Sequence, residues 1–352
     1  MNALARRLGL SHPLIQAPMA GVQLHALAVA VSEAGALGSL PAAMLSPDAL
    51  RDEVQAILAK TARPYNLNFF CHTEPAADPP AESAWLDALR PYYAELGVDV
   101  AKAGGGASRA PFGEQAAALV EAFRPPVLSF HFGLPPAPLL ERVRRAGAFV
   151  LASATTVDEA RWLEAHGADA VIAQGLEAGG HRGHFLSDEL SRQLGTFALL
   201  PQLKQAVRVP VIAAGGIADA AGVAAAMALG ADGVQVGTAY LLCPEATTSA
   251  VHRAALRSDA AAHTALTNLF TGRPARGIVN RVMRELGPLR LPPHPAFPRS
   301  TAALAPLRAA AEARGSGDFS PLWSGQNNTG CRAVPAAELT RALCRGFEGH
   351  SE

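Results

Sequence analysis

The sequence predicts an α/β fold, a TIM (β/α)8 barrel with a C-terminal helical extension covering the carboxyl end of the barrel. Eight short apolar runs alternate with amphipathic segments, which indicates βα units and a parallel sheet. A sequence motif, in which the end of a helix is followed by Gly, Ala and an apolar run, occurs four times, at 34–36, 146–148, 166–168 and 229–231. The first βα turn lacks G-x-G-x-x-G, which disfavours an open dinucleotide-binding sheet.

The first part of the chain supplies two helices between its strands. Apolar residues from Leu24 to Ala34 recur at helical spacing, and Gly35 ends that helix. Ser46 is the expected N-cap of a second helix over 47–60. The eight expected strands lie near 14–17, 37–40, 66–70, 127–131, 148–152, 169–173, 210–214 and 233–237.

The middle of the chain is less regular at first and then returns to the repeat. Residues 74–111 are proline-rich, then helical over 81–96, then glycine-rich. Further on, Thr156 to Glu159 has the form of a capping box. Asp219 is the expected N-cap of the helix that ends at Gly230.

The pattern changes after Cys243. The alanine-rich segment 247–267 is predicted to be helical, residues 286–298 are dense in proline, and 302–314 and 335–345 are again helical. We therefore predict a barrel formed by 1–244 and 327–352. Residues 245–326 are predicted to form a helical extension that covers the substrate.

Composition excludes several classes of partner. The chain has 352 residues, is 49% apolar and has a formal net charge of zero, so neither nucleic acid nor an anionic membrane surface is an expected partner. The four cysteines stand far apart without metal-ligand spacing. The N-terminus has no apolar core for a signal peptide, and no run is long enough to span a bilayer. A cytoplasmic monomer or homodimer is expected.

Glycines follow the seventh and eighth strands, where a barrel of this kind usually holds phosphate. Gly215 and Gly216 follow the seventh strand, and Gly237 and Thr238 follow the eighth. Glycine lets the backbone approach an anion, and the threonine adds a hydroxyl donor. Two ordinary βα turns are the alternative interpretation, and the coordinated pairs favour a phosphate site.

Other strand ends carry groups that suit a heteroaromatic ring. Ala17, Pro18 and Met19 offer a flat apolar support, while Asn68 and Gln174 offer amides. The strand ends hold neither a lysine for a Schiff base nor a cluster of carboxylates with histidine for a metal. A bound cofactor is therefore expected to carry the reaction.

Two histidines lie at these strand ends. His131 interrupts an apolar strand and is the predicted acid/base residue, with a hydrogen-bonded core histidine as the alternative. His181 stands beside Gly179 and Gly180 in a glycine-rich loop, which favours a cofactor or structural contact.

Six segments resemble the nitronate monooxygenases, formerly called 2-nitropropane dioxygenases. The resemblance covers about 13–326. The segments are 15–21, 129–133 (Ser-Phe-His-Phe-Gly), 173–183, 213–217, 235–238 and 272–277. It implies a TIM barrel that binds FMN non-covalently and oxidises alkyl nitronates with O2 to a carbonyl compound and nitrite, without a nicotinamide cofactor.

The resemblance also assigns roles to residues. His131 would be the active-site histidine, as base or as hydrogen-bond donor to the nitro oxygens. Phe297 stands where a tyrosine is expected, and no lysine follows Lys204, which implies a more apolar pocket. The residues that would contact FMN are Ala17, Pro18, Met19, Asn68, Gln174, Gly179, Gly216, Gln235, Gly237 and Thr238.

Two other functions remain open from the sequence. One is a related FMN barrel that uses NAD(P)H, such as an enoyl-thioester or quinone reductase. The other is a non-catalytic barrel used as a binding or regulatory module, which would purify without flavin.

Overall fold

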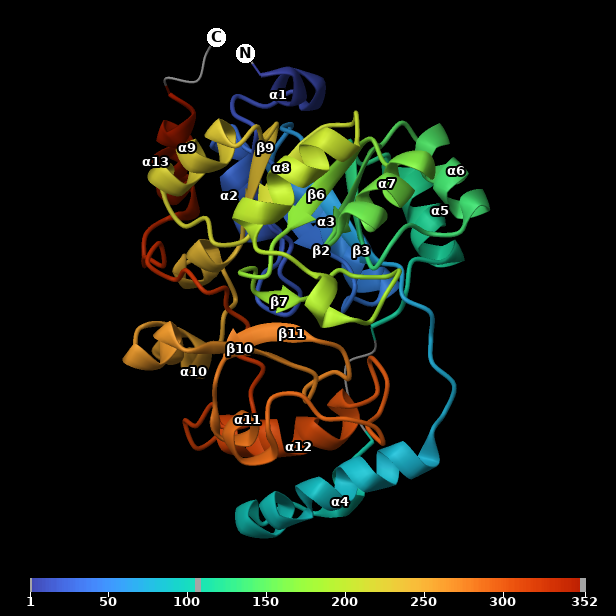
Figure 1. The fold of residues 1–352 in the computed structure, drawn as a ribbon, viewed down its shortest axis with the longest axis vertical. Helices are drawn as coiled ribbons and strands as arrows, with labels where there is room; N and C mark the ends of the chain where they lie inside the picture. Colours follow the sequence, from blue (N-terminus) through green and yellow to red (C-terminus); the bar gives the residue numbers. More distant parts are fainter. Residues whose placement is uncertain (1, 105–108, 349–352) are drawn as a thin grey trace.

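The computed structural model describes residues 2–104 and 109–348 and contains two layers. A barrel of parallel strands and surrounding helices forms one layer (Figure 1). A smaller layer with the strands β10 (Thr264–Thr267) and β11 (Ala275–Ile278) lies at one end of the barrel, and the helices α10 to α12 and α4 lie around it. The helices α1 (Ala3–Leu8) and α13 (Ala336–Cys344) lie toward the opposite end of the barrel.

The barrel is closed, and all eight predicted strands are confirmed. The sheet has the order β1-β9-β8-β6-β5-β4-β3-β2, and every pair within it is parallel. A bridge between Ile15 and Leu37 joins the two edge strands. The strands are β1 (Leu14–Gln16), β2 (Gly38–Pro41), β3 (Tyr65–Phe70), β4 (Val127–His131), β5 (Phe149–Ala154), β6 (Ala170–Gln174), β8 (Val211–Ala214) and β9 (Gly233–Val236).

Helices follow the strands as the amphipathic pattern predicts. The first, α1 (Ala3–Leu8), instead closes the amino end of the barrel, because Leu4 and Leu8 pack on inward residues such as Ile15 and Ile212. The other barrel helices are α2 (His25–Glu33), α3 (Pro47–Lys60), α5 (Glu114–Phe123), α6 (Ala137–Arg145), α7 (Val157–Ala165), α8 (Thr196–Ala206), α9 (Ala220–Ala228) and α13 (Ala336–Cys344).

The predicted caps are present, one of them only in part. Ser46 Oγ accepts from Ala49 N, and Asp219 Oδ1 accepts from Gly222 N. Thr156 Oγ1 accepts from the N–H of Glu159, but the Glu159 carboxylate does not return to Thr156. It accepts instead from the backbone N–H groups of Thr155 and Phe185, so the capping box is half formed and ties the 175–186 loop to α7.

The second layer corrects one sequence prediction. Residues 247–267 are not one helix: α10 (Ala250–Leu256) and a short turn at Asp259–Ala262 lead into the strand β10. This strand pairs with β11, which pairs in turn with β7 (Gly180–His181). Most of the alanines therefore keep a helical conformation, and sheet pairing with β11 and β7 makes only the end of the segment a strand.

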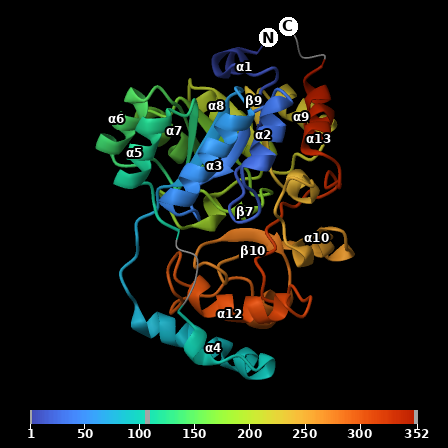
Figure 2. The ribbon, with the colours of Figure 1, turned by 180° about the vertical axis from the view of Figure 1, so that it is seen from behind.

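The helix α4 (Pro79–Leu96) lies on the far side of α12 (Thr301–Glu312) from the barrel, as both views show (Figure 2). Its Trp85 and Tyr93 are buried with Leu304 and Leu307 of α12 and with Met283 of α11 (Arg281–Leu286). The division of the chain at 244 and 327 stays a prediction. Among the helices of the described residues, none is both long and apolar enough to cross a bilayer.

Candidate functional site

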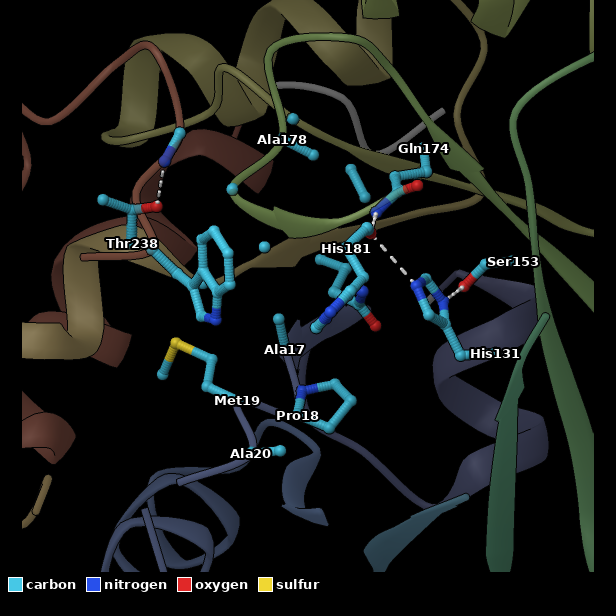
Figure 3. A pocket seen from close by; sticks show the side chains of 18 of the residues that line it. Ala17, Pro18, Met19, Ala20, His131, Ser153, Gln174, Ala178, His181 and Thr238 are labelled. Atoms are coloured by element: carbon cyan, nitrogen blue, oxygen red, sulfur yellow. Dashed lines mark hydrogen bonds between the residues drawn. The ribbon is translucent and has the colours of Figure 1, made fainter. Parts of the chain in front are cut away.

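Strand alternation brings the predicted site residues to one rim of the barrel. Successive side chains in a strand face opposite sides, so Asn68, His131 and Gln174 point inward from β3, β4 and β6. They line a cavity between the two layers with about 1340 Å³ of empty space, solvent at its mouth included (Figure 3). The other predicted residues that line it are Ala17, Pro18, Met19, Gly179, Gly180, His181, Gly215, Gly216, Gln235, Gly237 and Thr238.

One wall of the cavity is apolar and follows β1. Ala17, Pro18 and Met19 face the cavity there (Figure 3). A Cβ built on Gly237 would lie 3.3 Å from Ala17 Cβ and 3.7 Å from Met19 Sδ, so β9 approaches this wall closely. Any larger side chain at Gly237 has to extend into the cavity.

The glycines after β8 are required by backbone geometry. Gly215 and Gly216 have φ values of 119° and 74°, which side chains rarely adopt. On the facing loop, a Cβ on Gly179 would lie 2.5 Å from the backbone nitrogen of Gly325. Thr238 Oγ1 accepts from that same nitrogen at 2.9 Å, which leaves the threonine hydrogen available to a ligand.

Three side-chain amides line the cavity, and they differ in which of their polar atoms is available to a ligand. Asn68 Nδ2 contacts Ser129 Oγ at 3.0 Å and the Ser129 carbonyl at 3.2 Å, so its oxygen is the free end. Gln174 holds the loop that follows it, because Oε1 accepts from Gly183 N and Nε2 donates to the His181 carbonyl. Gln235 Oε1 is buried without a hydrogen-bond partner among the described residues, as an acceptor kept for a ligand would be.

A buried arginine fixes the glycine-rich loop. Arg182 is 0% exposed and donates to the carbonyl oxygens of Gly175 and Gln174 and to Gln193 Oε1. Burial lowers its pKa to about 9, so it remains charged at neutral pH. The guanidinium thereby satisfies the backbone at the end of β6 and sets the position of His181.

His131 is half-buried and hydrogen-bonded at both ring nitrogens. Nε2 lies 3.1 Å from the His181 carbonyl, which can only accept, so Nε2 carries the hydrogen. Nδ1 then accepts from Ser153 Oγ at 3.1 Å. Burial, with smaller contributions from the charges of Arg273 and Arg182, lowers the His131 pKa to about 3, so the ring is neutral at physiological pH.

His181 also lines the cavity, and in Figure 3 its ring lies between the β1 wall and Gln174. Its Nε2 contacts Thr271 Oγ1 at 2.9 Å. Burial and then the charge of Arg109 hold its pKa well below the usual range for histidine. Thr238 and His131 lie on opposite sides of this view. The cavity therefore has a glycine-rich end at Gly237 and Thr238, and a separate histidine end at His131 and His181.

Phe297 is not among the residues that line the cavity. It is buried in an aromatic cluster behind the rim, with ring centroids 4.8 Å from His72 and 5.3 Å from His181. Its role therefore depends on supporting His181 and stays a prediction.

Sequence reasoning missed several residues that line the cavity. Ser129 and Ser153 lie on strands but carry no motif of their own, and only inward alternation from His131 would have found them. Trp323, Gly325 and Asn327 come from the segment that connects α12 to α13. Arg109 comes from the loop before α5. In the described parts of the chain, no group of three or more metal-ligating side chains is placed to hold a metal ion.

The buried histidines predict loss of stability in acid. Burial lowers the pKa of His131 and His184 to about 3, and of His72 and His252 to about 4. Below pH 6.5 the unfolded chain therefore binds protons that the folded chain excludes, and stability falls as pH falls. Each histidine contributes up to about 1.4 kcal/mol for each pH unit between 6.5 and its folded pKa. Urea unfolding at pH 7.5, 6.5 and 5.5 measures this, and equal unfolding free energies would contradict it.

Comparison with known proteins gives matches that span the chain. The sequence profile of a family described as nitronate monooxygenase matches residues 2–346. The nitronate monooxygenase of Pseudomonas aeruginosa is 44% identical over 350 residues, covering 99% of each chain. That of Paraburkholderia phytofirmans is 43% identical over 347 residues, covering 98% of this chain and 94% of the relative. The solved nitroalkane oxidase of Streptomyces ansochromogenes superposes with a TM-score of 0.88 at 38% identity, covering 97% of both chains. These likenesses include both layers of the structure.

Proposed function

The chain belongs to the nitronate monooxygenase family, and from this premise we propose that it oxidises alkyl nitronates with O2, using FMN, to a carbonyl compound and nitrite. It is an oxidoreductase. Family membership supports a flavin cofactor, and FMN is the form we propose. The observation that carries the proposal is that every residue predicted to contact FMN lines one cavity.

The residues present fit a phosphorylated flavin. The unpartnered Gln235 Oε1 suits a ring N–H, and the apolar wall from Ala17 to Met19 suits a ring face. The backbone at Gly216 and Gly237, with the Thr238 hydroxyl, suits the phosphate. Bound FMN would accept electrons from the substrate and pass them to O2.

The chemistry of His131 favours an anionic substrate. Its lone pair lies on Nδ1 and holds the Ser153 hydroxyl, while its only N–H is used by the His181 carbonyl. With a pKa near 3, the ring is a weak base, so the removal of an α-proton by His131 is slow, and the small turnover of nitroalkanes that remains depends on it. A nitronate has already lost its α-proton and needs no base, whereas a neutral nitroalkane must lose that proton in the site.

Nitrite release from a panel of preformed alkyl nitronates, run beside NADH oxidation, tests the proposal. We expect yellow protein, nitrite in air, and no rapid bleaching of the flavin on anaerobic mixing with NADH. Rapid bleaching with NADH and no nitrite would favour the NAD(P)H-dependent reductase. Colourless protein would favour the binding module.

The substitution His131→Ala is expected to keep the flavin but to lower turnover of nitroalkanes about 100-fold. On preformed nitronates the loss is expected to stay below about tenfold, because no proton has to be removed. Nitrite assays on both substrate forms measure the two losses. His166→Ala, at an exposed histidine beside α7, is the control. Equal losses on the two forms would rule out proton removal by His131.

A further inference from the structure

The second-layer rim of the cavity contains a buried positive charge that the described residues leave without a negatively charged partner. Arg109 is 8% exposed and lines the cavity together with Phe70, His131 and His181. Its only hydrogen bond among the described residues runs from Nη1 to Thr301 Oγ1 at 3.1 Å. No carboxylate of the described residues lies within ion-pair distance of it.

Arg182 and Arg276, the two other arginines near the cavity that are buried to the same degree, have their charge balanced by several hydrogen-bond acceptors. Arg182 donates to three acceptors, and Arg276 donates to the Leu176 carbonyl and to Thr264. Arg273 is only half-buried; it donates to the His184 carbonyl and lies over the Phe132 ring, 4.2 Å from its centroid, although its Nε has no hydrogen-bond partner among the described residues. Within residues 2–104 and 109–348, the guanidinium of Arg109 contacts neither a set of carbonyls nor an aromatic face, although it carries five N–H donors.

A buried charge without a partner is costly, so such a group usually marks a site where a ligand supplies the partner. Burial lowers the Arg109 pKa to about 10, so the side chain still carries its charge at neutral pH. Arg109 lines the cavity together with His131 and His181, and its charge also contributes to the lowered pKa of His181. The two neutral imidazoles there cannot balance an anion.

We propose that Arg109 pairs with the negative charge of the substrate and thereby makes the enzyme select the anionic nitronate over the neutral nitroalkane. This inference rests on the proposed function and names the residue that sets its specificity. A planar guanidinium can donate two parallel hydrogen bonds to the two oxygens of a planar anion. A neutral nitroalkane gains much less from the same group, so the ratio of kcat/KM values between the two forms depends on residue 109.

The test compares Arg109→Met with Arg109→Lys. Arg109→Met is expected to lower kcat/KM for ethyl nitronate by at least about 30-fold, as for removal of one partner of a buried charge pair, and for nitroethane by less than about threefold. Arg109→Lys keeps the positive charge but not the paired N–H donors of the guanidinium, and its kcat/KM for the nitronate is expected to fall about tenfold. The control Arg90→Met removes an exposed arginine of α4 that pairs with Asp87 and is expected to change neither value.

Anion binding gives a measurement that does not depend on turnover. Sodium nitrate supplies a planar anion, and its dissociation constant for the purified holoprotein is measured by isothermal titration calorimetry. We expect Arg109→Met to weaken nitrate binding at least about 30-fold relative to wild type. Unchanged nitrate affinity, or equal losses of kcat/KM on nitronate and nitroethane, would overturn the inference.

The failures of the two proposals are distinguishable. If no form of the protein releases nitrite, yet nitrate binding depends on Arg109, the anion site stands and the reaction is wrong. If nitronates are oxidised and Arg109→Met behaves as wild type, the reaction stands and the specificity residue is wrong. Should Arg109→Met fail to fold, Arg109→Lys decides alone, because unchanged nitrate affinity in that variant contradicts the bidentate pairing.

Discussion

Replacing Gly237 with valine is expected to yield a folded protein that purifies without flavin. The backbone there has φ −116° and ψ −73°, so a side chain does not require the left-handed conformation reserved for glycine, and the expected effect is mainly one of space. The Cβ would lie 3.3 Å from Ala17 Cβ, against the apolar wall, and the two methyl groups beyond it have to occupy the cavity. Absorbance near the flavin bands, relative to protein, measures the loss.

Two variants bracket this prediction. Gly237→Ala adds only the Cβ, which needs a shift of a few tenths of an ångström, so partial flavin retention is expected. Gly113→Val is the control, because the backbone at Gly113 is extended and its Cβ would meet only the Pro111 carbonyl at 3.8 Å. Full flavin content in Gly237→Val would remove the end of β9 from the cofactor site.

The second large effect is expected for Arg182→Met, which should lower the free energy of unfolding by about 3–5 kcal/mol. Three charge-assisted hydrogen bonds are lost, and the carbonyl oxygens of Gln174 and Gly175 are left buried without a donor. Methionine fills much of the space, so the loss reports on the polar contacts more than on a cavity. Denaturant unfolding of wild type and variant, each at saturating FMN, measures the difference.

The same substitution is expected to disturb the site. The carbonyl of His181, next in the chain, holds both Gln174 and His131, so loss of the loop frees the His131 ring. Arg161→Met, on the exposed face of α7, should change the unfolding free energy by less than about 0.5 kcal/mol. A loss of similar size for Arg182→Met would show that the loop is held by its other contacts.

The barrel was predictable because its signals are local. Each strand is a short apolar run followed by a turn, and the repeated Gly-Ala motif marks where helices end. All eight strands could therefore be predicted from the sequence. The glycines at Gly215, Gly216 and Gly237 were found for the same reason, since each follows a strand directly. The strand order of a barrel then brings them to one rim without further information.

The second layer was not predictable in this way, because its structure depends on pairing between distant segments. Alanine-rich sequence before β10 favours a helix locally, and only the partner strand β11 and the short β7 decide otherwise. The sequence pattern of α4 does not differ from that of a barrel helix, yet the apolar face of α4 is buried against α12. Neither the pairing of β10 nor the packing partner of α4 can be recognised from the periodicity of these segments.

The ring of strands, the glycine-rich turns and the residues at the carboxyl rim could all be predicted from the sequence, since period-two alternation and turn chemistry are properties of adjacent residues. The protonated nitrogen of His131 could not, nor could the absence, among the described residues, of a hydrogen-bond partner for Gln235 Oε1 and of a carboxylate beside Arg109. Hydrogen-bond partners and burial come from segments far apart in the chain, and these set charge and protonation in the site.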